Sequence, residues 1–189
     1  AGLQPDAIAA AGPLAGYVPL DADGPALAPA AMYSDRRSAA DVAAMESVLG
    51  SARPARLLVS DPLAHWLRLR REQPTIAART RHFLDATGWL NHALTDQATL
   101  NAYTAMRLYT PALREQVGAG DAPFGRPVAI GERLGLAVGC ARWGWAGVPV
   151  IAATFDSKCA YIGSGIAAPG EALDISGTVT SFGVVSDQR

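Results

Sequence analysis

Two short motifs near the end of the sequence have residue types that could do chemistry together. The apolar run 148–155 is followed directly by Asp156, and a Gly-Thr pair stands further on at Gly177 and Thr178. The run is rich in β-branched residues and too short for an ordinary helix, so it predicts a buried strand that leaves Asp156 at its carboxyl end. A carboxylate in that position can take a proton from a hydroxyl, and the backbone N–H groups of a Gly-Thr turn can hold phosphate oxygens. This combination indicates phosphoryl transfer.

A simpler interpretation of Asp156 is also open. Asp is a favoured N-cap residue, because its carboxylate accepts hydrogen bonds from the first N–H groups of a helix. Asp156 would then only cap the element that follows the strand.

The segments around these motifs alternate between strand-like and helix-like patterns, which predicts an α/β fold. Six apolar runs bounded by turn residues are expected to form strands of one sheet: 7–12, 17–21, 30–33, 148–155, 171–176 and 178–185. Helix caps, prolines at first turns and apolar residues at helical spacing predict the helices: 38–49, 60–74, 75–94, 111–117 and 131–145. The largest helical mass is expected between residues 60 and 117, and a surface connection at 110–129.

Composition narrows the class of protein. The chain has 189 residues, of which 50% are hydrophobic and 17% charged, with a formal net charge of -1. This charge gives no electrostatic reason for binding nucleic acid or an anionic membrane. No leader of basic and then apolar residues and no run of membrane-spanning length is found, so the expected location is the cytoplasm.

Cysteines and histidines give no sign of a metal site. Cys140 and Cys159 form neither a disulfide framework nor a ligand cluster, and both are expected to be free buried thiols. His82 and His92 have no carboxylates at ligand spacing. No metal site made of these side chains is predicted.

The order of motifs in the last third of the chain resembles a known family. An apolar strand, Asp156, a Gly-x-Gly at 163–165, a Pro-Gly-Glu at 169–171 and a closing Gly-Thr are similar to the FGGY carbohydrate kinases of the actin-like ATPase superfamily. The resemblance implies a ribonuclease H-like domain, with a mixed sheet flanked by helices. It also implies that Asp156 is the catalytic base, that Gly177 and Thr178 belong to a hairpin holding the nucleotide phosphates, and that ATP and Mg²⁺ are used.

The resemblance extends to the expected substrate site, with one departure. It assigns substrate contacts to Leu14 and Ala15 in the loop between two glycines, to Asp35, and to Ser157 beside the base. Xylulose kinases carry Met-His in this loop and glycerol kinases Arg-Glu, but Leu14 and Ala15 have no side-chain hydrogen-bonding group. For Asp35 the alternative is an ion pair with a neighbouring arginine at the surface.

The resemblance covers nearly all 189 residues but only part of such a kinase. It places 1–189 in the later part of the N-terminal, sugar-binding domain, without the family's N-terminal Asp-x-Gly-Thr phosphate turn and its C-terminal nucleotide domain. The chain alone is therefore expected to be inactive, and an unpaired sheet edge is expected to favour a homodimer. The expected activity of the complete enzyme is ATP-dependent phosphorylation of a sugar or polyol hydroxyl. The alternative is a non-catalytic sugar-binding or regulatory module that retains the fold.

Overall fold

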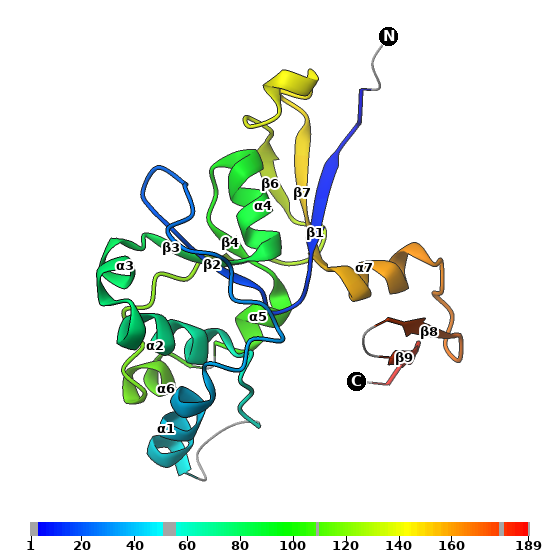
Figure 1. Ribbon diagram of the computed structural model, residues 1–189. Coiled ribbons are helices and arrows are strands. Elements are labelled where there is room, and N and C mark those ends of the chain that lie inside the picture. Colours follow the sequence, from blue (N-terminus) through cyan, green and yellow to red (C-terminus); the bar gives the residue numbers. More distant parts are fainter. Residues whose placement is uncertain (1–3, 51–55, 109, 178–179, 189) are drawn as a thin grey trace.

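The computed structural model describes residues 4–50, 56–108, 110–177 and 180–188. Helices and strands alternate along the chain in an α/β arrangement (Figure 1). The strands are β1 Ile8–Gly12, β2 Tyr17–Leu20, β3 His82–Asp85, β4 Thr99–Leu100, β5 Arg126–Pro127, β6 Arg133–Leu136, β7 Pro149–Phe155, β8 Ala172–Ser176 and β9 Thr180–Val184. The α-helices are α1 Ala39–Leu49, α2 Pro62–Glu72, α3 Pro74–Arg79, α4 Ala86–Thr95, α5 Ala102–Met106, α6 Pro111–Gln116 and α7 Asp156–Gly163. Across these ranges, no helix has the length and apolar character needed to cross a membrane.

The strand that ends at the predicted base lies in the middle of a mixed three-stranded sheet. β7 pairs in parallel with β1 on one side and antiparallel with β6 on the other. Its alternate residues Val150, Ala152 and Thr154 are buried, and α4 packs on the sheet (Figure 1). Gly12 is the register partner of Phe155. The two strands therefore end side by side, at the same end of the sheet.

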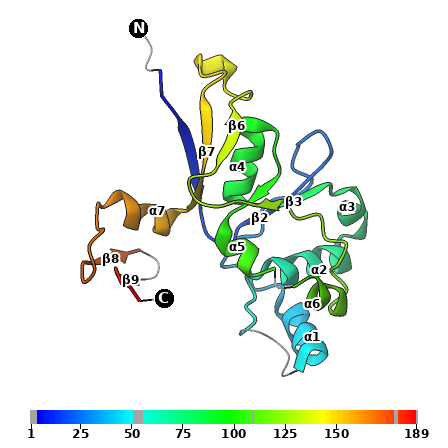
Figure 2. The same cartoon turned by 180° about the vertical axis from the view of Figure 1, so that it is seen from behind.

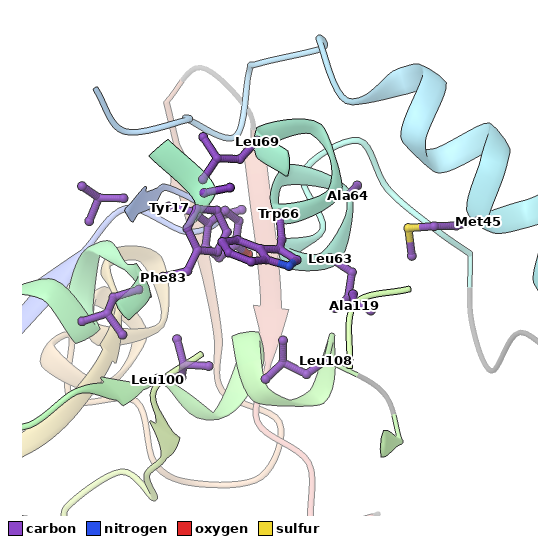
Figure 3. Packing of buried hydrophobic residues seen from close by; sticks show 14 of the residues in the cluster. Tyr17, Met45, Leu63, Ala64, Trp66, Leu69, Phe83, Leu100, Leu108 and Ala119 are labelled. Atoms are coloured by element: carbon purple, nitrogen blue, oxygen red, sulfur yellow. The ribbon is translucent and has the colours of Figure 1, made fainter. Parts of the chain in front are cut away.

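The larger apolar core lies below this sheet, between the β2–β3 ribbon and the helices. Figure 3 shows the aromatic rings of Tyr17, Trp66 and Phe83 packed together beside α2, with Met45 of α1 farther away in the same cluster. The ring centroids of Tyr17 and Phe83 are 5.8 Å apart and those of Trp66 and Phe83 are 5.5 Å apart. These contacts join the helical layer to the ribbon that carries the chain away from β1.

The last part of the chain stands apart from α1, α2 and α6, as both views show (Figures 1 and 2). α7 leaves the sheet directly after β7, and β8 and β9 form an antiparallel hairpin beside it. The Tyr161 hydroxyl on α7 donates a hydrogen bond to the carbonyl oxygen of Ser181 at 2.6 Å. The hairpin is thereby attached to the helix that begins at Asp156.

The predicted single sheet is wrong, although the strands at 8–12, 17–20, 149–155, 172–176 and 180–184 are confirmed. In the described residues these strands divide among separate sheets. β2 leaves the plane of β1 and pairs with β3, because the chain turns sharply at the loop after Gly12. The expected strand at 30–33 contributes only an isolated bridge between Tyr17 and Ala31.

Two of the predicted helices are also corrected. The segment 75–94 is not one helix: α3 ends before Thr80, and β3 intervenes before α4. The segment 131–145 forms β6 and a short 3-10 helix instead. Glycines explain the second correction, since Gly135 has a φ of +147° and Gly139 lies so close to the Ala93 carbonyl that a side chain has no room. The helices at 39–49, 62–72 and 111–116 are confirmed.

Candidate functional site

Asp156 lies where the sequence places it, at the carboxyl end of β7, and its side chain is exposed. It is the first residue of α7, whose N-cap position is taken by Phe155 in an extended conformation. The Asp156 Oδ1 atom accepts a hydrogen bond from the Ser157 backbone N–H at 2.7 Å. Asp156 is thus one residue past the cap position, although its carboxylate does contact the first turn of the helix.

A cavity of about 570 Å³ opens beside Asp156. It brings together five of the seven residues that the sequence nominates: Leu14, Ala15, Asp156, Ser157 and Gly177. They come from the loop after β1, the end of β7, the start of α7 and the end of β8. The other lining residues are Pro13, Tyr17, Tyr33, Leu58, Ser60, Asp61, Tyr103, Arg107, Phe155, Ile175 and Ser181.

Two nominated residues are not part of this lining. Thr178 lies outside the described residues. Asp35 lies away from the cavity, and its carboxylate pairs with Arg37 at 2.6 Å and with Arg68 at 3.6 Å. Hydrogen bonding to Arg37 holds the pKa of Asp35 well below its usual range. This is the ion-pair alternative raised for Asp35 from the sequence.

The loop after β1 forms one wall of the cavity and is held rigidly. The Gly12 N–H donates to Thr87 Oγ1 at 3.2 Å, and a side chain at Gly12 would collide with Ala86. Ala15 is only 5% exposed and has a φ of +55°, a left-handed conformation that is costly for alanine. Non-glycine residues held in this conformation persist only where the surrounding structure fixes them.

A second wall is polar and was not found by sequence reasoning. Arg107, the C-cap residue of α5, and Asp61 before α2 form an ion pair with an Nη2–Oδ2 distance of 2.7 Å. Tyr103, also on α5, lies edge-on to Phe155, with ring centroids 5.4 Å apart. Asp61 was recognised only as the start of a helix. Because Arg107 lies far away in the sequence, no local pattern marks the two as partners.

A buried carboxylate keeps α5 in place. Asp85 accepts hydrogen bonds from the Gly88 N–H at 2.7 Å and from the Asn101 side-chain amide at 2.8 Å. Burial raises the pKa of Asp85. Asn101 in turn caps α5 by accepting from the Thr104 N–H at 3.0 Å. Asp85 therefore joins the start of α4 to the start of α5, the helix that carries Tyr103 and Arg107 to the cavity.

The described ranges contain no group of three or more His, Cys, Asp or Glu side chains that could hold a metal ion. His82 and His92 instead pack together, with ring centroids 5.3 Å apart. Cys140 and Cys159 are both free thiols, as expected, but only Cys140 is fully buried.

Comparison with known proteins finds likeness at the level of structure. No protein-family model matches the chain, and no curated protein sequence matches it. The xylulose kinase from Rhodospirillum rubrum is similar, with a TM-score of 0.81, 20% identity and coverage of 91% of this chain. A carbohydrate kinase from Novosphingobium aromaticivorans has a TM-score of 0.65, 22% identity and coverage of 84%. The Plasmodium falciparum glycerol kinase, solved with ADP, has a TM-score of 0.66, 16% identity and coverage of 88%.

These likenesses show the fold. The chain has the α/β fold of part of a carbohydrate kinase, as the resemblance in the sequence implies. It spans 39%, 37% and 37% of the lengths of the three proteins. At these identities the likeness concerns the fold alone.

Proposed function

We propose that this chain is part of the sugar-binding domain of an ATP-dependent carbohydrate kinase, which phosphorylates a hydroxyl of a sugar or polyol. The observation that carries the proposal is the cavity that joins Asp156 to Leu14, Ala15, Ser157 and Gly177. A solvent-accessible carboxylate, a substrate loop and the start of a hairpin turn meet there. The fold of the similar sugar and glycerol kinases supports the same conclusion.

In the proposed mechanism Asp156 is the general base. Its carboxylate accepts the proton of the substrate hydroxyl as that oxygen attacks the terminal phosphorus and ADP leaves. Ser157 and the polar wall of Tyr103 and Arg107 orient the substrate. Asp156 suits this role because it directly follows Phe155, whose position is fixed by pairing of β7 with β1.

ATP, when bound, supplies the phosphoryl group. Gly177 lines the cavity directly after β8, and a backbone N–H group in that position suits a phosphate oxygen. We propose Thr178 as the partner of Gly177 in this role. The described residues do not form a Mg²⁺ site by themselves, and no step is assigned to the metal.

A non-catalytic sugar-binding or regulatory module is the second candidate. The observation that favours it is the loop wall, where Leu14 and Ala15 offer no side-chain hydrogen bond to a hydroxyl. Such a module would bind a polyol in the same cavity and would not transfer phosphate.

Replacing Asp156 by Asn separates the two candidates. In the native gene product, loss of a general base is expected to lower kcat for sugar phosphorylation by about two to four orders of magnitude, with little change in sugar affinity. Asp23→Asn is the matched control, since Asp23 is an exposed acid in the turn after β2. Phosphorylation at the wild-type rate in Asp156→Asn would refute the base. Sugar binding with no phosphate transfer by the wild-type protein would favour the module.

A further inference from the structure

The cavity has walls of unlike chemistry. On one side, Pro13, Leu14 and Ala15 present side chains that carry no hydrogen-bonding group. On the other, Ser60, Tyr103, Arg107 and Asp61 supply hydroxyl, guanidinium and carboxylate groups. A ligand that fills this space meets hydrogen-bonding side chains in one part of the lining and apolar side chains at the loop 13–15.

The apolar loop 13–15 is held in place by its contacts with the rest of the fold. Ala15 is buried and held at a positive φ, and Leu14 packs against the larger apolar core. Gly12 is fixed by its hydrogen bond to Thr87 and by contact with Ala86. Both ends of the segment Gly12–Ala15 are therefore fixed by the surrounding structure.

The apolar wall also lies within reach of the base. Gly12 is the register partner of Phe155, so Pro13 and Asp156 leave neighbouring strands together. Leu14 is two residues beyond Gly12 and lies in a turn, so the Cα atoms of the two residues are less than about 7 Å apart. A short sugar chain is of comparable length. A sugar placed with its reacting hydroxyl at Asp156 would extend toward Leu14, because both residues line the same cavity.

From these observations we propose that the substrate turns a carbon without a hydroxyl, a methyl or deoxy group, toward the loop Pro13–Leu14–Ala15. This rests on the proposed function and specifies its substrate class as deoxy sugars or deoxy polyols. A hydroxyl buried against this wall would lose its hydrogen bonds to water and find no side-chain partner. A methyl group would instead gain apolar contact with Leu14.

Binding of matched ligand pairs tests the proposal without requiring turnover. We would titrate the chain, carrying ¹³C-labelled leucine methyl groups, with 1-deoxy-D-xylulose against D-xylulose and with propane-1,2-diol against glycerol. An apolar subsite typically discriminates a single group by about tenfold to a hundredfold, so the deoxy member of at least one pair is expected to bind about tenfold tighter. Nuclear Overhauser contacts between the ligand methyl group and the Leu14 methyl groups are expected in that complex.

A change in the wall should change this preference. Leu14→Gln adds a hydrogen-bonding group of similar size and is expected to bring the affinity ratio to about one or below it. Leu113→Gln makes the same substitution at a partly buried core position on α6 and should leave the ratio unchanged. If Leu14→Gln does not fold, the Overhauser contacts in the unmodified chain decide the point.

The outcomes separate this inference from the proposed function. Equal or tighter binding of the hydroxylated member in both pairs overturns the inference and leaves the kinase proposal standing. A preference for the deoxy ligand that survives in Leu14→Gln overturns the assignment to this loop. Absence of binding by all four ligands overturns the inference, whereas the kinase proposal is decided by the Asp156→Asn experiment.

Discussion

Arg107 and Asp61, which both line the cavity, form a bidentate ion pair. Arg107 Nε donates to Asp61 Oδ1 and Nη2 donates to Oδ2, each at 2.7 Å, and the Asp61 side chain is 2% exposed. Both residues also hold the chain that enters α2. The Leu58 N–H donates to Asp61 at 2.8 Å, and Arg107 donates to the Arg56 carbonyl oxygen at 2.8 Å. The pair therefore fixes the segment that brings Leu58 to the cavity.

Arg107→Met is expected to destabilise the chain strongly. It removes the guanidinium from a bidentate pair with the buried Asp61 carboxylate, and breaking a buried ion pair typically costs about 3–5 kcal/mol in the free energy of unfolding. Urea denaturation measures this loss. Arg70→Met is the control, because the Arg70–Asp121 pair is exposed and is worth about 1 kcal/mol or less. Similar losses in the two variants would show that the Arg107 pair is not an important buried contact.

The loop geometry predicts a second, steric effect at Ala15. A β-branched residue is especially unfavourable at a positive φ, and this site is buried. Ala15→Val should therefore lower the free energy of unfolding by about 2–4 kcal/mol, from backbone strain and overpacking together. Ala10→Val provides the comparison, since Ala10 is half-buried in strand β1, where valine is favoured. A loss no larger at position 15 than at position 10 would contradict the prediction.

His65 makes stability depend on pH. His65 Nδ1 lies 3.0 Å from the Ser38 hydroxyl, and burial, with the nearby Arg68 charge, lowers the pKa of His65 to about 4. The fold thus holds a neutral imidazole, whereas the unfolded chain takes up a proton at its ordinary pKa of about 6.5. The stability contribution is complete above about pH 6.5 and is lost as the pH falls toward 4. At about 1.4 kcal/mol per pKa unit, the loss approaches about 3 kcal/mol.

The control for this pH effect is His65→Asn, compared with the unmodified chain by urea denaturation between pH 4.5 and 7. The difference between the two should shrink as the pH falls, because only His65 is removed. Asp85 acts in the opposite sense, since burial raises its pKa and its protonation at low pH favours the fold. A difference that does not vary with pH would show that His65 titrates normally.

Local sequence patterns were sufficient to predict the elements in which the local pattern and the contacts with the rest of the chain favour the same structure. The β-branched run before Asp156 and the helix that begins with Pro62 are of this kind. Local patterns failed where pairing with a distant segment decides whether residues form a helix or a strand. Phe83 and Leu84 fit a helical period as well as a strand, and become β3 because β2 offers them a partner.

The candidate site follows the same division. Asp156 and Gly177 were found because each stands at the end of a recognisable strand. The Arg107–Asp61 pair was missed, since ion pairing between distant residues leaves no periodic signal. The motif-based assignment of Asp35 to substrate meets a structure in which its carboxylate is already paired with Arg37.

Tyr161 links α7 to the hairpin, and its hydroxyl is expected to hold the hairpin in position. It donates to the Ser181 carbonyl oxygen at 2.6 Å, and its ring packs against Gly183, where a side chain would not fit. Tyr161→Phe keeps the ring and removes the hydrogen bond, at a cost of about 1 kcal/mol. Hydrogen exchange at the amides of β8 and β9 should then become about fivefold faster, while exchange in β7 stays unchanged. Tyr33→Phe, at an exposed tyrosine, should leave exchange in the hairpin and in β7 unaffected.

In the proposed kinase the looser hairpin should weaken nucleotide binding more than sugar binding. Unchanged exchange in the hairpin of Tyr161→Phe would mean that contacts other than this hydrogen bond hold β8 and β9 beside α7.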